Sequence, residues 1–500
     1  MASQIISRFR RSSLYGAGAE TLVFSILNSA FRFGKSIVVA VLYGVGVQTD
    51  VFYAAQNFLF TPTSLLASSL NAMVIPAYQA AKEKGNFAYS YLLGMFIPLA
   101  VFACIFVLFG KEASSIVFSG FTTDAKMLLW KMLLVFSPLI LLMPIKALFD
   151  SLYRAEKILI YGNMGRLLNT VISLLLLILF SGLNVFGLAY ASMGGIVIEA
   201  SILVFFFLRQ FQFHGRLELA ESLRLITKSF PVLFGGLLAI ASLYFERYLA
   251  SFLPPGTITL HSMALGVIDI LRTVFVGSLV GAFYPFISEL VVAGKKDEFY
   301  SLLSRMKEMI FGVLGLLMVA SCSLSSPLFV FVYGHGKFDA LSAIRLSQQY
   351  NILSFSIIYA ASGNINSFLY YSKFETKLQQ IVNLAVAIIT GYLQWVLLAN
   401  LGLKALAIGA EVALGISLLL DYILLKWKFG YKIYEAKDIV AMAISLIIAI
   451  VCGFARWEPW FLIIPILYYI GITKYLYGLN IGKILRLLAP PRKIGNGRMP

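Results

Sequence analysis

The chain has 500 residues, of which 60% are hydrophobic and 13% are charged, and its mean hydropathy is +0.87. A soluble domain carries about 25% charged residues, so this composition excludes a soluble enzyme and predicts an all-α polytopic membrane protein. The net charge of +17 does not indicate nucleic-acid binding, because Lys and Arg lie in short connections between apolar runs and form no compact basic domain.

Apolar runs recur along the whole chain and predict about 14 membrane-spanning segments. Helices are expected, because in lipid every backbone N–H and C=O must be paired within its own segment. The predicted helices cover residues 20–45, 49–80, 87–110, 125–153, 160–182, 184–208, 223–253, 257–292, 298–323, 338–372, 376–400, 403–427, 436–453 and 459–478. The first segment contains Arg32 and Lys35 and lacks a small-residue cleavage pattern, so we interpret it as a retained span and not as a signal peptide.

An internal repeat predicts two halves. A helix that starts at Thr49, ends in Val74-Ile75-Pro76 and leads into a basic loop is matched by a helix from Ile258 that ends in Phe283-Tyr284-Pro285. The repeat predicts an N-lobe of six helices over 1–210, a cytoplasmic linker over 211–221 and a C-lobe of six helices over 222–430. An even number of helices gives the two lobes the same orientation, which is typical of alternating access around a central cavity. Two further helices over 431–480 and a basic cytoplasmic tail over 481–500 complete the predicted chain.

The basic residues also predict the orientation in the membrane. They gather in alternate loops, for example at Lys295 and Lys296 and at Lys373 and Lys377, whereas the intervening loops hold only scattered charges. The positive-inside rule places the basic loops in the cytoplasm. With 14 spans, both termini are expected on the same cytoplasmic side.

Ionisable side chains within spans are the candidate substrate-binding residues, because each costs at least about 2.5–3.5 kcal/mol at mid-bilayer on insertion scales. Arg32 and Lys35 share one face of the first helix and could meet a diphosphate, unless both reach the membrane surface by snorkelling. Asp269 and Arg272 share a face of the eighth helix, where the alternative is an ion pair that neutralises itself. Asp50 opens the second helix, either as its cap or as a gating residue.

Polar residues of other spans are candidates for a cavity or an ion site. They are Glu199, Asn364, Asn366, Glu411 and Asp421. For the asparagines, hydrogen bonds between helices are the alternative role. Glu246 with Arg247 is expected to form a structural pair, and His261 to be an interfacial group.

The sequence contains no nucleotide-binding loop, no metal-binding motif and no nucleophile elbow. We therefore expect a transporter with no catalytic residue, no metal and no cofactor. The energy for transport is expected from a monovalent ion gradient, the membrane potential or the substrate gradient.

Six segments carry a family resemblance: YGVG at 43–46, TDVFYA at 49–54, VIP at 74–76, ERYLASFL at 246–253, YPFIS at 284–288 and YGHGKFD at 333–339. In their order and spacing they resemble the MurJ (MviN) lipid II flippases of the MOP transporter superfamily. The two extra C-terminal helices are also a property of MurJ-like proteins.

The resemblance implies a flippase that moves an undecaprenyl-diphosphate-linked cell-wall precursor, in the first place lipid II, across the inner membrane of a bacterium. It also implies a cationic central cavity and partners in cell-wall or polysaccharide synthesis. Where the family usually carries arginines, the nearest positions here are Ser29, Thr63, Ser64 and Gly266. An exporter of lipid-linked O-antigen or exopolysaccharide units, a cation-coupled drug exporter, and a membrane glycosyltransferase or scaffold therefore stay open as alternatives.

Overall fold

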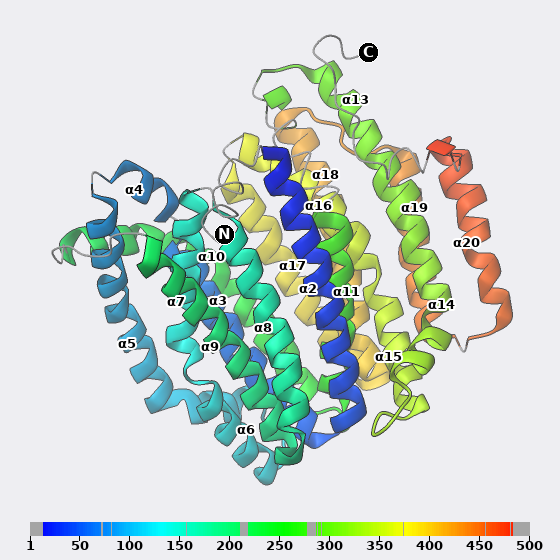
Figure 1. Cartoon of the computed structure of the whole chain (residues 1–500). Coiled ribbons are helices and arrows are strands. Elements are labelled where there is room, and N and C mark those ends of the chain that lie inside the picture. Colours follow the sequence, from blue (N-terminus) through cyan, green and yellow to red (C-terminus); the bar gives the residue numbers. More distant parts are fainter. Residues whose placement is uncertain are drawn as a thin grey trace. The chain divides into compact units, whose positions relative to one another are not determined.

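The computed structural model describes residues 14–71, 74–81, 83–156, 158–210, 219–277, 287, 289–291, 293–373, 375–455, 457–480 and 482–483. Every regular element in these ranges is helical (Figure 1). The α-helices are α2 (Leu14–Tyr43), α3 (Val47–Asn71), α4 (Val74–Ala80), α5 (Lys84–Val117), α6 (Thr123–Phe136), α7 (Leu139–Ala155), α8 (Ile160–Leu179), α9 (Asn184–Gln210), α10 (Leu219–Ser251), α11 (Thr257–Leu271), α13 (Lys296–Lys307), α14 (Gly315–Tyr333), α15 (Ala340–Leu353), α16 (Phe355–Ser372), α17 (Thr376–Leu401), α18 (Leu403–Phe429), α19 (Ala436–Phe454) and α20 (Ile463–Tyr468). Shorter 3₁₀ and π-helical segments are η1 (Ser181–Leu183), η2 (Arg272–Gly277), η4 (Glu308–Leu314), η5 (Pro459–Leu462) and η6 (Tyr469–Leu476).

The predicted all-α membrane fold is confirmed. Each of the 14 predicted segments is mostly helical where the structure describes it, although the predicted span 125–153 is divided between α6 and α7, and 338–372 between α15 and α16. Twelve segments of the described chain are long and apolar enough to cross a bilayer. Most of the predicted linker 211–221, part of the repeat around Pro285 and most of the tail after 480 lie outside the described residues.

Helix α3 is long enough to span but is not among these twelve segments, since it contains many Thr, Ser, Asn and Gln residues. Its environment explains this composition. Helix α3 packs against α6, α7, α10 and α11, and its residues Val51, Phe52 and Leu59 are fully or almost fully buried in a hydrophobic core. A helix covered by protein on most sides has little contact with lipid, so it does not need an apolar surface all round.

The described chain divides into two compact units. Unit 1 comprises the residues up to Val274 together with Val330–Ala343 and Gln394–Leu406, and unit 2 comprises Phe275–Phe329, Ile344–Leu393 and the residues from Ala407 onward. The division into an N-lobe and a C-lobe stays a prediction.

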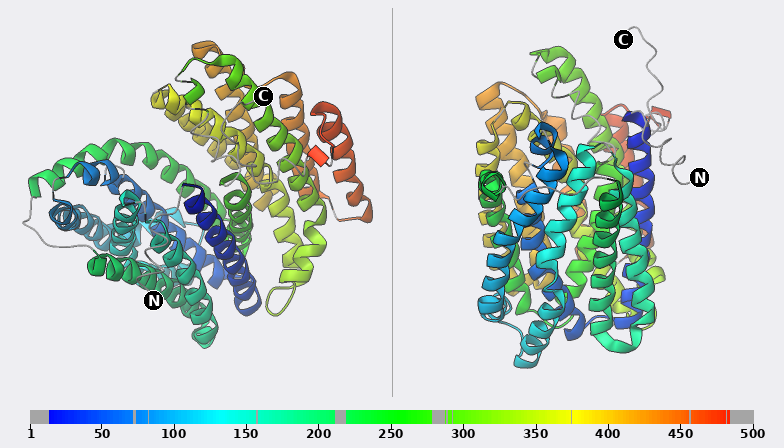
Figure 2. Two further views of the ribbon diagram at one scale, coloured as in Figure 1. Left: turned by 45° about the horizontal axis from the view of Figure 1, so that its top comes forward. Right: turned by 60° about the vertical axis from the view of Figure 1, so that its left-hand side comes forward.

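Within unit 1, α8 and α9 form a closely packed hairpin connected through η1 (Figures 1 and 2). A Cβ atom at Gly195 of α9 would collide with Ser173 and Asn169 of α8, so the absence of a side chain permits this approach. Small residues at helix contacts are a general feature of membrane proteins, in which tight packing replaces the hydrophobic effect between helices.

Within unit 2, a buried ion pair connects the start of α19 to α13. Lys307 Nζ lies 2.8 Å from Asp438 Oδ2 and 3.0 Å from Glu435 Oε1, and the side chains of Lys307 and Asp438 are 5% and 0% exposed. Tyr477 donates a further hydrogen bond of 2.7 Å to Asp438 Oδ1. Asp438 and Glu435 also form the capping box of α19, so the same carboxylates start this helix and neutralise the buried ammonium.

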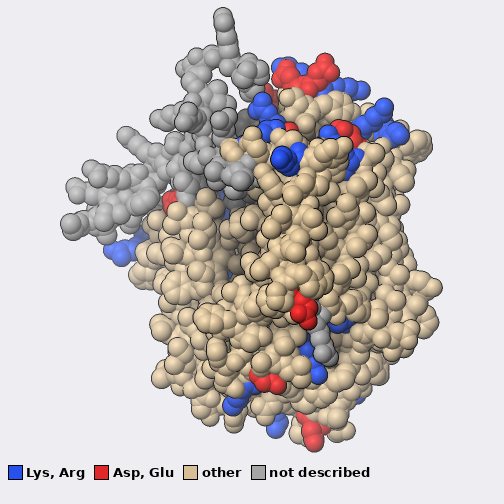
Figure 3. All heavy atoms as spheres, turned by 90° about the vertical axis from the view of Figure 1, so that its right-hand side faces the viewer, with Lys and Arg blue, Asp and Glu red and all other residues tan. Residues whose placement is uncertain are grey.

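The surface agrees with a membrane protein. In the face drawn in Figure 3, acidic and basic side chains gather toward the two ends, and a broad band between them is largely free of charge. Large hydrophobic side chains are exposed along the helices, for example Leu179, Phe331 and Trp427. Such a band fits the hydrocarbon layer of a bilayer.

Candidate functional site

Asp50 lies in the first turn of α3, yet its carboxylate caps a different helix. Its Oδ2 accepts a hydrogen bond of 2.6 Å from the Gly256 backbone N–H, and its Oδ1 accepts bonds of 2.7 and 2.6 Å from the backbone N–H and the hydroxyl of Thr259. These two N–H groups stand at the start of α11, where backbone donors lack intrahelical partners. Gly256 has no side chain with which to cap its own helix and adopts a left-handed φ of +92°. Asp50, 4% exposed, supplies the missing acceptor and a negative charge for the positive end of the helix.

A second set of polar contacts lies next to this cap. Glu246 of α10 receives hydrogen bonds on its two oxygens, with His261 Nε2 of α11 at 3.2 Å and Gln394 Nε2 of α17 at 3.1 Å. His261 and Gln394 are 1% and 0% exposed. Glu246 therefore connects α10, α11 and α17 through side chains that are removed from solvent and lipid.

Arg247 is the cation of this region. It is 3% exposed, its Nη1 donates a hydrogen bond of 3.4 Å to Ser262, and its charge acts on both Glu246 and Asp50. We call Asp50, Glu246, Arg247, His261 and Gln394, together with Gly256 and Thr259, the junction. The junction ties the start of α3 and the start of α11 to the ends of α10 and α17.

Helix α2 is held at the same end of unit 1. Ser36 forms a hydrogen bond of 3.2 Å with Tyr333 at the end of α14, and the Lys337 backbone N–H donates to the Val41 carbonyl at 3.0 Å. With the junction, these contacts hold together the part of unit 1 at which α2 ends and α3 begins.

The predicted basic face of α2 is present. Arg32 is exposed, and Lys35, three residues further along, donates a hydrogen bond of 3.2 Å to Ser192 of α9. In the described part of the chain neither cation forms an ion pair with a carboxylate. Helix α2 packs against α11, so the structure brings together the two helices that carry Arg32, Lys35 and Asp269, and Arg272 follows in η2 directly after α11.

Asp269 and Arg272, at the end of α11 and the start of η2, form the ion pair that was the alternative to substrate binding. Arg272 Nη1 lies 3.6 Å from Asp269 Oδ1, and the two side chains are 31% and 55% exposed. An exposed pair of this length contributes little to stability, about 0–1 kcal/mol. The guanidinium group of Arg272 can therefore leave Asp269 for another anion at a small cost in free energy.

Glu199, a candidate for a cavity or ion site, is 2% exposed and already has partners. Its Oε2 accepts hydrogen bonds from Lys146 Nζ at 3.0 Å and from Asn169 Nδ2 at 2.6 Å. The ammonium of Lys146 neutralises the carboxylate, so this cluster fits a structural role between α7, α8 and α9.

In unit 2 the structure brings Asn366 and Asp421 together but leaves the other two candidates apart. Asn366 Nδ2 donates to Asp421 Oδ2 at 3.1 Å. Asn364 is only partly buried and has no such contact with Asp421, and Glu411 is buried elsewhere on α18 at 1% exposure. Among the described residues, no group of three or more His, Cys, Asp or Glu side chains could hold a metal ion.

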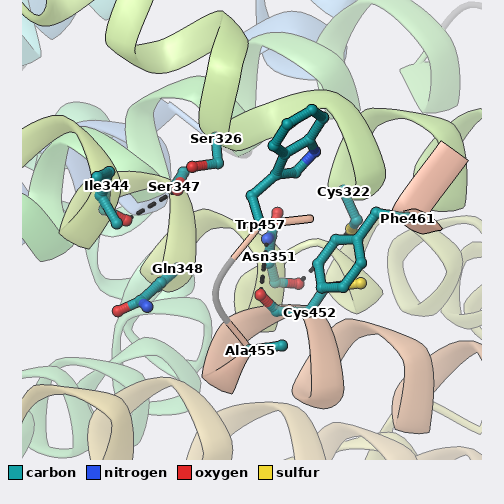
Figure 4. A pocket seen from close by; sticks show the side chains of 10 residues that line it. All are labelled: Cys322, Ser326, Ile344, Ser347, Gln348, Asn351, Cys452, Ala455, Trp457 and Phe461. Carbon is teal, nitrogen blue, oxygen red and sulfur yellow. Dashed lines mark hydrogen bonds between the residues drawn. The ribbon is translucent and has the colours of Figure 1, made fainter. Parts of the chain in front are cut away.

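A small pocket in unit 2 lies between α14, α15, α19 and the segment 455–461 (Figure 4). It is lined by Cys322, Ser326, Ile344, Ser347, Gln348, Asn351, Cys452, Ala455, Trp457 and Phe461. Its volume of about 10 Å³ matches the space of about one water molecule. The pocket is therefore far too small for a sugar headgroup and is not a substrate site.

Several residues of these clusters were missed by the sequence reasoning. Gln394, Lys146 and Lys307 each occur inside a predicted span, and the cost of burying a polar group in lipid would have marked them as candidates. Thr259 gave no such signal, because a threonine at a helix start is common.

Known proteins share the sequence pattern and the fold of this chain. The sequence profile of the family described as "Lipid II flippase MurJ" matches residues 39–470. The chain belongs to this family. No curated protein matches it in sequence.

Solved structures with the same fold include members of the wider superfamily. This MurJ family member resembles a structure described as "Lipid II flippase MurJ, inward closed conformation", with a TM-score of 0.73 and 19% identity over 91% of this chain and 99% of that chain. It also resembles an inward-facing multidrug resistance MATE transporter of the MOP superfamily, with a TM-score of 0.62 and 15% identity over 83% of this chain and 98% of that one. A MOP superfamily transporter from Pyrococcus furiosus, described as having a binding pocket of reverse polarity, gives a TM-score of 0.58 and 12% identity over 86% and 98% of the two chains. At these identities the structural likeness establishes the fold.

Proposed function

We propose that this MurJ family member moves a lipid-linked sugar precursor with a diphosphate group, in the first place lipid II, across a bacterial inner membrane by alternating access. The observation that carries the proposal is the basic face of α2. Arg32 and Lys35 lie within a span, and in the described chain they have no carboxylate partner.

The chemistry of the substrate explains why unpaired cations are needed. A diphosphate that enters a cavity of low dielectric loses its hydration shell, and hydrogen bonds from charged groups must replace it. Each such bond contributes about 1.5–3 kcal/mol. Arg272 would add a third cation from η2, because its exposed pair with Asp269 is weak.

In this proposal the junction is the closed end that alternating access requires, because its contacts hold the ends of α2, α10 and α17 and the starts of α3 and α11 together. By the positive-inside rule α2 runs outward, so the junction lies at the outer side of the membrane and the cationic face of α2 is reached from the cytoplasm. Labelling of engineered cysteines tests this orientation. A cysteine in place of Lys296 should react only with reagent on the cytoplasmic side, and one in place of Pro255 only from outside; labelling of both from one side would contradict the topology.

Flipping in proteoliposomes tests the substrate. We expect Lys35→Ala and Arg272→Ala each to weaken binding and flipping of lipid II about 10- to 100-fold, and Lys35→Arg to retain activity because it keeps the charge. Lys111→Ala is the matched control, since Lys111 is an exposed lysine at the far end of α5, and it should behave as wild type.

Cells depleted of their own lipid II flippase provide the decisive cargo test. Growth restored by the wild-type chain, but not by Lys35→Ala, supports lipid II transport. Normal flipping by both alanine variants would refute the cationic-cavity mechanism. Failure to rescue growth, combined with export of a lipid-linked O-antigen unit or of a drug, would favour the corresponding alternative.

A further inference from the structure

A buried carboxyl group in unit 2 has only neutral partners among the residues that the structure describes. Asp421 of α18 is 7% exposed. Its Oδ1 accepts a hydrogen bond of 3.0 Å from the Tyr370 hydroxyl, and its Oδ2 accepts one of 3.1 Å from Asn366 Nδ2. Asn366 is fixed in turn by Tyr434, whose hydroxyl donates to Asn366 Oδ1 at 3.1 Å.

The groups around Asp421 come from two elements. Helix α16 contributes Asn366 and Tyr370, and the segment between α18 and α19 contributes Tyr434, which is 3% exposed. Within the described chain no Lys, Arg or His forms an ion pair with Asp421, and none acts on its charge. The nearest basic residues along its own helix, Lys426 and Lys428, lie in the last turn of α18.

A second buried aspartate in the same unit shows the contrast. Asp438 is 0% exposed but lies 2.8 Å from the ammonium of Lys307, so its negative charge is compensated. Asp421 is also buried, at 7% exposure, and has no compensating cation in the described part of the chain. An ionised carboxylate in such a site costs several kcal/mol, whereas a protonated carboxyl group does not carry this penalty.

The surrounding donors also favour a proton over a metal ion. A hard cation requires several oxygen ligands, but Asn366 presents its N–H group to Asp421 while its oxygen is occupied by Tyr434. The Tyr370 hydroxyl can donate to a carboxylate or, after rotating, accept from a protonated carboxyl group. The site can therefore accommodate both protonation states of Asp421 without moving a heavy atom.

We propose that Asp421 is a proton-binding site and that it takes up and releases a proton during the transport cycle. On uptake one O–H bond of hydronium breaks, one O–H bond forms on Asp421 and a water molecule is left. Release to water reverses this step, so no other reactant is needed. Lys426 lies five residues further along α18, about 7.5 Å along the helix axis, which gives a short path to the side of the membrane where α18 ends. The exchange of the proton during the transport cycle rests on the proposed function, whereas the proton-binding site itself does not.

Infrared spectroscopy of the full chain in lipid nanodiscs tests the site without any transport assay. We expect the carbonyl stretching band of a protonated carboxyl group to grow as the pH is lowered from neutral, and this band to lose intensity in Asp421→Asn. The matched control Asp269→Asn should leave the band unchanged, because Asp269 is 55% exposed and paired with Arg272. Tyr370→Phe should shift the frequency of the band, since it removes one hydrogen bond from the carboxyl group; a purely structural role of Asp421 would give no such shift. Identical bands in wild type and Asp421→Asn would overturn the proposal.

Flipping under an imposed pH gradient tests the coupling. The wild-type rate should change several-fold with the direction of the gradient, and the rate of Asp421→Asn should not. Equal sensitivity of both proteins would overturn the coupling. A band assigned to Asp421 in a protein that moves no lipid II would count against the proposed function and leave the proton site standing.

Discussion

Replacing Asp50 by alanine should loosen the start of α11. The change removes three hydrogen bonds, of 2.6, 2.7 and 2.6 Å, that a single buried carboxylate accepts from Gly256 and Thr259. Hydrogen bonds to a charged group contribute about 1.5–3 kcal/mol each. Because they share one acceptor they are not additive, and we expect a total loss of about 3–5 kcal/mol, as for other broken buried charge contacts.

Hydrogen–deuterium exchange of the Gly256 and Thr259 amides measures this loss directly. A loss of 1.5–3 kcal/mol per amide corresponds to roughly 10- to 150-fold faster exchange. Asp50→Asn should give an intermediate rate, since one amide oxygen can still accept, and Asp269→Ala, which removes an exposed acid at the other end of α11, should not change the rate. Unchanged protection of both amides in Asp50→Ala would refute the capping argument.

Three further changes test other parts of the structure by thermal unfolding. Lys146→Met should destabilise the protein by about 3 kcal/mol because it leaves Glu199 buried without a cation, and adding Glu199→Gln should recover most of the loss; no recovery would contradict the pairing. The hydrogen bond from Lys307 lowers the pKa of the Glu435 carboxyl, so its stabilisation is complete above the unfolded value of about 4.3 and is lost as the pH falls through the lower folded value. The difference in unfolding temperature between wild type and Glu435→Gln should accordingly shrink in acid, and a difference that grows there would disprove this. Gly44→Ala should cost about 1–3 kcal/mol, because the residue has a φ of +69° and a Cβ would meet a backbone carbonyl; wild-type stability would show that the turn adapts.

The sequence predicted the helices well, because a membrane imposes a strong local constraint. A run of about 20 apolar residues can hardly be anything but a spanning helix, and its detection requires no knowledge of its neighbours. The less apolar α3 was still recognised as a helix, although nothing local indicated that it would be enclosed by α6, α7, α10 and α11.

The sites were predicted less completely, since their partners are distant in the sequence. Asp50 was expected to cap its own helix or to act as a gate, and it caps α11, whose Thr259 lies 209 residues away. Glu246 was expected to pair with its neighbour Arg247, but its hydrogen bonds go to His261 and Gln394. The rule that a polar residue in a span has a partner holds at each of these positions. The rule does not identify the partner, because tertiary packing determines which residue that is.

The ion pair between Lys307 and Asp438 also sets an order of events during synthesis. The two residues are 131 positions apart, so at about 5–20 residues per second Asp438 leaves the ribosome roughly 7–26 s after Lys307. Until then the ammonium of Lys307 lacks the carboxylates of Glu435 and Asp438 that neutralise it in the folded protein. The contacts that neutralise Lys307 thus form only when the start of α19 arrives. A chain that ended before α19 would leave this ammonium without its carboxylates, so we expect removal of the two C-terminal helices to destabilise unit 2.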